Sequence, residues 1–144
     1  MSDNFFLDSN ICIYAFGIDN KKKQKALDLI ISSQATISTQ VLMETANVAT
    51  KKLNFSQEKL LLSCDYITTF CSVHIIELST IKLAFQIRKR YQYSLYDSLV
   101  IASALESNCS ILYSEDMQHG HFIGYFGDSD IDKCLRIVNP FHFL

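Results

Sequence analysis

The fold is set by the stretch Phe5-Phe6-Leu7-Asp8-Ser9-Asn10-Ile11-Cys12-Ile13-Tyr14. Its three leading apolar residues predict a short buried strand, and the residues after Asp8 are typical of the start of a helix. An acidic residue therefore stands where a strand gives way to a helix. Asp8 has two interpretations at this position: it caps the helix that follows, or its carboxylate binds a ligand at the end of the strand.

The same pattern of short apolar run and helix recurs along the chain. Predicted strands cover residues 4–7, 35–38, 72–76, 110–113 and 135–138, and helical patterns include residues 22–32, 56–70, 79–91 and 94–102. The alternation predicts an α/β protein with a mainly parallel central sheet of about five strands, flanked by helices. Some connections are expected to contain two successive helices.

Three more acidic residues occupy positions comparable to that of Asp8. Glu44 lies on the apolar stripe of its predicted helix, a face that a solvated carboxylate avoids. Asp97 follows Ser94 by three residues, the spacing of a capping box, so a capping role is its alternative interpretation. Asp116 follows a predicted strand, where an ordinary polar turn is the alternative.

These acidic residues are all expected near the same end of one sheet. Ligand sites of open α/β sheets form outside the carboxyl ends of the strands, and carboxylates without partners are costly to bury. We therefore expect one or two Mg²⁺ or Mn²⁺ ions, which prefer oxygen ligands, to be shared by Asp8, Glu44, Asp97 and Asp116. Three neighbours are expected to orient these carboxylates or to act only as caps: Ser9, Asn10 and Ser114.

Taken in order, the motifs of this chain resemble PIN-domain ribonucleases, and most of all the VapC toxins of VapBC toxin–antitoxin pairs. The resemblance is carried by FLDSNI at 6–11, STQVLME at 38–44, YSLYDSLVIASA at 93–104, LYSEDMQHG at 112–120 and VNPF at 138–141. It covers essentially the whole chain at family-like spacing. One departure is the stretch 122–132, which is longer than the family pattern and affects the expected loop structure there, not the acidic set.

The resemblance implies a PIN-like fold and metal-dependent endonucleolytic cleavage of RNA that leaves a 5′-phosphate and a 3′-hydroxyl, with transfer RNA as one candidate substrate. It also implies a cognate antitoxin in the active-site cleft and a homodimer. Within the acidic set we expect Asp8 and Asp97 to be central metal ligands, Glu44 a ligand or a water-positioning group, and Asp116 a peripheral ligand. Two alternatives stay open: a housekeeping RNA-processing nuclease of the same chemistry, and a non-catalytic PIN-like module that binds RNA or protein.

Composition limits the class of protein. The 144 residues are 49% hydrophobic with only 4 Gly and 1 Pro, which predicts a single domain over residues 1–144. The apolar runs are much shorter than the roughly 20 residues of a membrane span, and residues 1–4 lack a basic start, so we expect a cytoplasmic protein without membrane contact. Five scattered cysteines show no zinc-type spacing and are expected to be mostly buried thiols.

The net charge of −2 gives no general attraction to nucleic acid, so any RNA contact must be local. The stretch Arg88-Lys89-Arg90-Tyr91 leads into the helix that carries Asp97 and is the candidate RNA-binding segment. Clusters at 21–25 and 51–52 fit solvated helix faces better. Two other α/β functions lose support, because Asn10 replaces the second aspartate of a haloacid dehalogenase and no glycine-rich phosphate loop follows a strand.

Overall fold

The computed structural model describes residues 4–126 and 132–144. Its elements are, in order, β1 (Phe5–Leu7), α1 (Ser9–Ala15), α2 (Asn20–Ile31), β2 (Ala35–Ser38), α3 (Thr39–Lys52), α4 (Gln57–Phe70), β3 (Ser72–His74), α5 (Leu78–Tyr91), α6 (Leu95–Glu106), β4 (Ile111–Tyr113), β5 (Phe122–Phe126) and β6 (Asp132–Val138). Two successive helices connect β1 to β2, β2 to β3, and β3 to β4. The predicted α/β alternation with double-helix connections is confirmed.

The strands form one sheet with the order β3-β2-β1-β4-β6-β5. The pairs among β1, β2, β3, β4 and β6 are parallel, which confirms the predicted mainly parallel sheet. Within the described residues the sheet has six strands where we expected about five. The additional strand, β5, pairs antiparallel with β6 and comes from the stretch that departs from the family pattern, of which residues 127–131 lie outside the described parts. Its aromatic and β-branched residues suit a strand.

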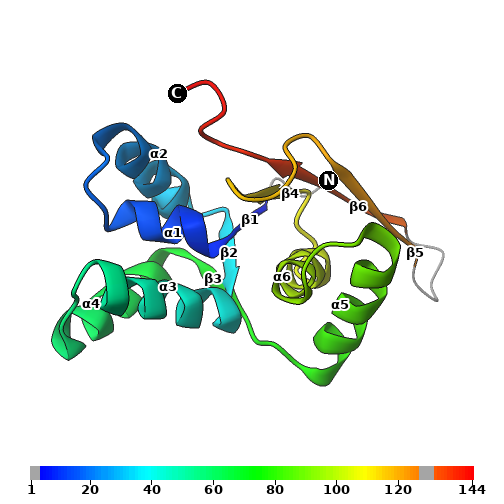
Figure 1. The fold of residues 1–144 in the computed structure, drawn as a ribbon, viewed down its shortest axis with the longest axis horizontal. Coiled ribbons are helices and arrows are strands. Elements are labelled where there is room, and N and C mark those ends of the chain that lie inside the picture. The colour runs from blue at the N-terminus through cyan, green and yellow to red at the C-terminus, as the bar shows by residue number, and fades with distance from the viewer. Residues whose placement is uncertain (1–3, 127–131) are drawn as a thin grey trace.

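The core lies between the sheet and the helices that cover it. Helix α6 contacts β2, β4 and β6, and α5 packs on α6, so that both helices lie on one side of the sheet in Figure 1. The largest fully buried side chains include Phe6, Leu7, Ile37, Ile101 and Leu112. Each such side chain contributes roughly 1.5–3 kcal/mol by leaving water, so this core holds the sheet edge in place. In the described parts of the chain, no helix has the length and apolar character needed to cross a membrane.

Tight strand-to-helix junctions fix where the polar side chains stand. A single residue, Asp8, separates β1 from α1, and β2 runs directly into α3. Ser38, the last residue of β2, caps α3 by accepting a hydrogen bond from the backbone N–H of Val41 at 3.2 Å. At the end of β4, the backbone N–H of Ser114 donates to the carbonyl of Val138. These junctions leave little freedom to the residues at the carboxyl edge of the sheet.

Candidate active site

Asp8 is both a helix cap and a buried carboxylate. Its Oδ1 accepts a hydrogen bond from the backbone N–H of Ser9 at 2.7 Å, and the residue is 5% exposed. Burial raises the pKa of Asp8 to about 6, although hydrogen bonds from Ser114 and Ser9 act in the opposite direction. An ionised carboxylate in such a place is costly without a cation beside it, so the capping role leaves the predicted ligand role open.

The Ser114 hydroxyl connects the end of β4 to the end of β1. It is fully buried and donates a hydrogen bond to Asp8 Oδ2 at 2.9 Å. The same oxygen accepts hydrogen bonds from the backbone N–H groups of Asp116 and Met117, at 3.2 and 3.3 Å. Ser114 therefore holds the Asp8 carboxylate and the loop after β4 in one arrangement.

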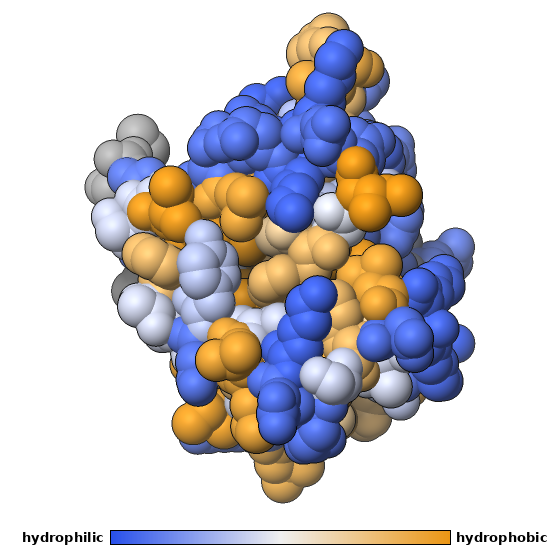
Figure 2. Space-filling model, turned by 90° about the vertical axis from the view of Figure 1, so that its left-hand side faces the viewer, coloured by the Kyte–Doolittle hydropathy of each residue, from blue (hydrophilic) through white to orange (hydrophobic). Residues whose placement is uncertain are grey.

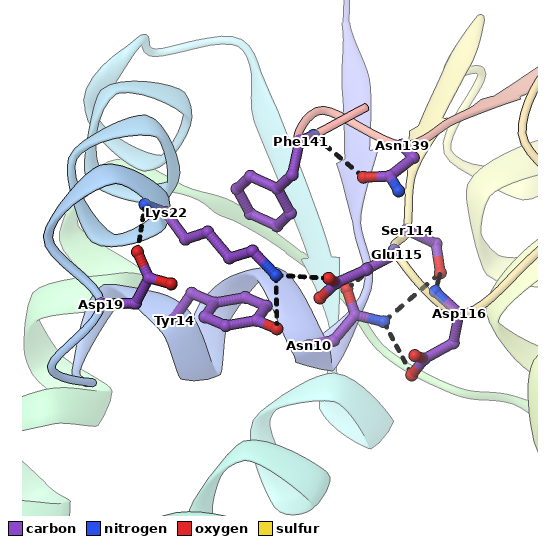
Figure 3. A network of polar contacts seen from close by, with 9 residues as sticks. All are labelled: Asn10, Tyr14, Asp19, Lys22, Ser114, Glu115, Asp116, Asn139 and Phe141. Carbon is purple, nitrogen blue, oxygen red and sulfur yellow. Dashed lines mark hydrogen bonds and ion pairs between the residues drawn. The ribbon is translucent and has the colours of Figure 1, made fainter. Parts of the chain in front are cut away.

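Asn10, in the first turn of α1, joins the same network (Figure 3). Its Nδ2 donates to Asp8 Oδ2 at 3.4 Å. The same Nδ2 donates to Asp116 Oδ2 at 3.2 Å, the bond drawn in Figure 3. Its Oδ1 accepts a hydrogen bond from the backbone N–H of Glu115 at 3.2 Å. The amide thus links two of the predicted site carboxylates, whereas the contribution of Ser9 to this network is its backbone N–H.

Glu44 projects from α3 and is half-buried. Its Oε1 accepts a hydrogen bond from Gln40 Nε2 at 2.7 Å, and the same Nε2 donates to the carbonyl of Tyr96 at 3.1 Å. Burial raises the pKa of Glu44, the Gln40 hydrogen bond lowers it, and repulsion from Asp97 raises it. Gln40 was not among the predicted site residues, although its place one helical turn before Glu44 is a signal that could have found it.

Asp97 lies in the first turn of α6. Its backbone N–H donates to the hydroxyl of Ser94, the N-cap, at 3.1 Å, as the spacing of the two residues predicts. Burial raises the pKa of Asp97, a hydrogen bond with Ser94 lowers it, and repulsion from Asp116 raises it. Asp97 therefore takes part in capping through its backbone N–H, as the spacing predicted. Its carboxylate remains within electrostatic range of Asp116.

The predicted carboxylates come from four separate segments and act on one another. Repulsion from Asp97 and Glu44 raises the pKa of Asp8. Repulsion from Asp97 likewise raises the pKa of Glu44, and repulsion from Asp116 raises the pKa of Asp97. Across the described ranges, however, no three His, Cys, Asp or Glu side chains stand together closely enough to hold a metal ion. The structure brings the acidic set within electrostatic range without drawing it into a coordination shell.

An ion pair borders this site that the sequence did not predict. Lys22 Nζ lies 2.6 Å from Glu115 Oε1 and donates to the Tyr14 hydroxyl at 3.1 Å. Lys22 belongs to a cluster that we interpreted as a solvated helix face, and for this residue the interpretation is wrong. No local sequence signal links Lys22 to Glu115, because the two residues are 93 positions apart.

The candidate RNA-binding segment forms the last turn of α5. Arg88, Lys89 and Arg90 are exposed there, immediately before the loop that leads to Asp97. Tyr91 has a structural contact, because its hydroxyl donates to the Gly124 carbonyl at 2.9 Å and accepts from the Gly124 N–H at 3.0 Å. Tyr91 therefore anchors β5 to the end of α5.

A separate apolar groove of about 280 Å³ lies between α3 and α4. Its walls are almost wholly apolar, and the residues that line it include Phe16, Leu42, Ala46, Phe55, Leu61 and Ile67. Figure 2 shows apolar side chains gathered around a hollow on the face of the molecule that α1 to α4 form. Exposed apolar surface of this kind is typical of a binding groove.

Fold and site together define a class: an α/β protein with acidic side chains at the carboxyl edge of a mainly parallel sheet. The family model of the PIN domain matches residues 5–122. The chain belongs to the PIN domain family, as the ordered motifs predicted. No curated protein matches its sequence.

Solved structures with the same fold include a toxin and a toxin–antitoxin complex. Mycobacterium tuberculosis VapC20, a sarcin–ricin loop cleaving toxin, has a TM-score of 0.65 and 16% identity, covering 78% of this chain and 90% of that one. A toxin–antitoxin complex from Klebsiella pneumoniae has a TM-score of 0.63 and 20% identity, covering 78% of this chain and 87% of that one. FitAB bound to an IR36 DNA fragment has a TM-score of 0.63 and 13% identity, covering 97% of both chains. At these identities the likeness establishes a shared fold.

Proposed function

We propose that the protein is a Mg²⁺- or Mn²⁺-dependent endoribonuclease that acts as the toxin of a toxin–antitoxin pair. The observation that carries the proposal is the buried Asp8 carboxylate, whose pKa is raised to about 6 and which two other acids from distant segments repel. Such an arrangement is unfavourable in a protein without a cation and suits one that binds a cation. Membership of the PIN family and the fold shared with VapC20 support the nuclease assignment.

The donor groups fit a hard divalent cation, because every predicted ligand is a carboxylate oxygen. In this proposal Asp8 and Asp97 are the central ligands, Glu44 is a ligand or positions water, and Asp116 is peripheral. A bound ion of this type supplies Lewis acidity, which lowers the pKa of water and offsets negative charge on a phosphodiester. Ser114 and Asn10 keep the Asp8 and Asp116 oxygens oriented through the hydrogen bonds described above.

RNA is the proposed substrate, with discrete internal cuts that leave a 5′-phosphate and a 3′-hydroxyl. The exposed cations Arg88, Lys89 and Arg90 lie at the end of α5, close in sequence to Asp97, and are proposed to contact phosphates. Tyr91 is a weaker candidate for stacking, because its hydroxyl already binds Gly124. Transfer RNA is one candidate target; the VapC20 toxin, by comparison, cleaves the sarcin–ricin loop.

An antitoxin is the proposed protein partner. The family resemblance implies that it occupies the active-site cleft, and the separate apolar groove between α3 and α4 offers it a second contact surface. The groove offers little besides apolar side chains, which suits the apolar face of a short helix from another protein. Among the structures with this fold are a toxin–antitoxin complex from Klebsiella pneumoniae and VapBC2 from Rickettsia felis bound to a DNA fragment from their promoter. Co-purification with a small protein encoded beside this chain would support the pairing, and a harmless protein that is stable when expressed alone would argue against it.

A homodimer is also part of the proposal. A second apolar hollow, of about 190 Å³, lies where α5 meets the start of α6. Phe85 and Tyr96, which line it, are 54% and 67% exposed. Light scattering after gel filtration would measure the mass, and replacing Phe85 with Glu is expected to convert a dimer to a monomer.

The decisive test is cleavage of total RNA by purified, antitoxin-free protein with Mg²⁺ or Mn²⁺. We expect discrete cuts that disappear with EDTA, and a loss of more than about 100-fold in Asp97→Asn, since even the outer partners of a metal site contribute roughly 10- to 100-fold. Asp65→Asn, an exposed acid on α4, is the matched control and should cut normally. Undiminished cleavage by Asp97→Asn would exclude Asp97 as a ligand, and no cutting by folded wild-type protein would favour a binding module. Growth arrest on expression would separate a toxin from a housekeeping nuclease.

A further inference from the structure

The Lys22–Glu115 ion pair lies beside the acidic site and ties helix α2 to the loop after β4 (Figure 3). The Nζ–Oε1 distance is 2.6 Å, and both side chains are about three-quarters buried, with 26% and 25% exposure. Asp19, the N-cap of α2, accepts a hydrogen bond from the backbone N–H of Lys22 at 3.1 Å, which fixes the residue at the start of its helix. The pair is therefore more constrained than an ordinary surface ion pair.

Two aromatic rings enclose the ammonium group. Lys22 Nζ lies 4.6 Å from the centre of the Tyr14 ring and 5.4 Å from that of Phe141, and the two rings contact each other edge to face at 5.1 Å. Phe141 is itself held by its backbone N–H, which donates to Asn139 Oδ1 at 2.9 Å. Three segments thus meet around Lys22: helix α1 through Tyr14, the loop after β4 through Glu115, and the chain after β6 through Phe141.

The protonation states favour a lasting ion pair. Hydrogen bonds to Glu115 and Tyr14 raise the pKa of Lys22. Burial acts to raise the pKa of Glu115, but hydrogen bonds from Lys22 and Tyr14 outweigh it and lower the pKa. The lysine is therefore a cation and Glu115 an anion over the whole neutral range.

The pair acts on the site through three consecutive residues. Ser114 is bound to Asp8, Glu115 to Lys22, and Asp116 to Asn10. Glu115 also donates its backbone N–H to Asn10 Oδ1, so a shift of Glu115 would disturb the amide that holds Asp116. With its side chain held by Lys22, the Glu115 carboxylate is kept apart from the neighbouring acids.

We propose that Lys22 is a positioning residue that clamps Glu115 and thereby holds the Ser114–Asp116 loop in the geometry that binds the metal ion. The clamp has two effects: it fixes Asp116, and it keeps a fifth carboxylate out of the acidic set. This inference rests on the proposed metal-dependent function. The inference gives Lys22, which belongs to the 21–25 lysine cluster, a structural role through its ion pair with Glu115.

The test measures Mn²⁺ binding by calorimetry on the full chain, independently of cleavage. Lys22→Met is expected to weaken Mn²⁺ affinity by about 10-fold, the lower end of what outer partners of a metal site contribute. Lys22→Arg should restore most of the affinity, because a guanidinium can bind both the carboxylate and the rings. Lys21→Met, an exposed neighbour in the same helical turn, is the matched control and should bind as wild type does.

A second variant keeps the inference falsifiable if Lys22→Met folds poorly. Glu115→Gln should weaken Mn²⁺ binding to a similar extent, and the double variant should be no worse than either single one, because both changes remove the same interaction. Unchanged affinity in folded Lys22→Met would overturn the proposal, as would a far larger loss in Glu115→Gln, which would make Glu115 a ligand. If wild-type protein itself binds no Mn²⁺, the proposed metal-dependent function fails instead.

Discussion

Asp8 and Asp116 are held by side chains 106 positions away in the sequence, whereas Glu44 and Asp97 are held by neighbours four and three positions away. In the first half of the site, the partners come from α1 and the loop after β4, which only the folded sheet brings together. In the second half, one helical turn places the partner beside the acid. The two halves do not divide by burial, because Asp8 is 5% exposed, Glu44 and Asp97 are half-buried, and Asp116 is exposed.

The difference indicates where the site is rigid and where it can adjust. A network in which one buried hydroxyl, that of Ser114, and one amide, that of Asn10, each have several partners resists change, because losing Ser114 leaves polar groups unpaired in the interior. A carboxylate on a helical turn can change rotamer when an ion arrives. We therefore expect Asp8 and Asp116 to form the fixed part of the site, and Glu44 and Asp97 the part that closes around the ion.

The largest effect is expected for Asp8→Asn. Cleavage should fall by more than about 100-fold, because a central ligand contributes more than the outer partners that contribute roughly 10- to 100-fold. Metal-free protein should nevertheless become more stable at pH 7.5. Raising the pKa of Asp8 from 3.8 to about 6 means that the ionised carboxylate lowers the free energy of unfolding by about 3 kcal/mol, and the substitution removes this penalty. The substitution also removes one hydrogen-bond acceptor, which lowers the free energy of unfolding by about 1 kcal/mol. Urea unfolding in EDTA measures the expected net gain of about 2 kcal/mol.

The pH dependence gives this prediction its sign. The folded state takes up the Asp8 proton at about pH 6 and the unfolded state only near 3.8, so the contribution of Asp8 to stability falls as pH rises through this window. The advantage of Asp8→Asn should therefore be full above pH 6 and vanish below about pH 4. A variant that is less stable than wild type at pH 7.5 would show that the buried carboxylate does not oppose folding.

A smaller effect is expected for Ser114→Ala, which removes the centre of the long-range network. Mn²⁺ affinity should fall by about 10- to 100-fold, and stability by about 1–3 kcal/mol, because the N–H groups of Asp116 and Met117 lose their acceptor. Calorimetric titration with Mn²⁺ and urea unfolding measure the two quantities. Ser107→Ala, whose hydroxyl binds the Ser103 carbonyl at the far end of α6, is the control for loss of a serine hydroxyl. If Ser114→Ala binds Mn²⁺ as tightly as wild type does, the long-range network is not what holds Asp8 and Asp116, and the distinction from Glu44 and Asp97 fails.

The smallest effect is expected for Gln40→Met, which loosens the local half of the site. The Gln40 amide holds Glu44 and the Tyr96 carbonyl, but its Oε1 is buried without a hydrogen-bond partner in the described parts of the chain. Removing an unsatisfied carbonyl offsets the lost hydrogen bonds, so stability should change by less than about 1 kcal/mol. Mn²⁺ affinity should fall by no more than about 10-fold. A loss as large as that of Ser114→Ala would show that Glu44 is as rigidly held as Asp8.

The comparison also shows how far the fold and the site could be predicted. The strands at 35–38 and 110–113, the helix at 56–70 with its Ser56 cap, and the double-helix connections follow from local periodicity and capping, and the structure has them. Strand β5 escaped prediction because antiparallel pairing with β6 depends on a neighbour, and Gly124 weakens its local pattern. Gln40 was within reach of sequence reasoning, whereas Tyr14 and Phe141 around Lys22 were not.

The sequence by itself determined the α/β alternation, the acidic positions at strand ends and helix starts, and membership of the PIN family, because these depend on residues close together in the chain or on motifs in fixed order. The tertiary structure alone decided that Ser114 and Asn10 join Asp8 to Asp116, and that Lys22 pairs with Glu115 and not with solvent. These contacts link segments about a hundred residues apart. Only the packing of β1 beside β4 brings them within reach of a hydrogen bond.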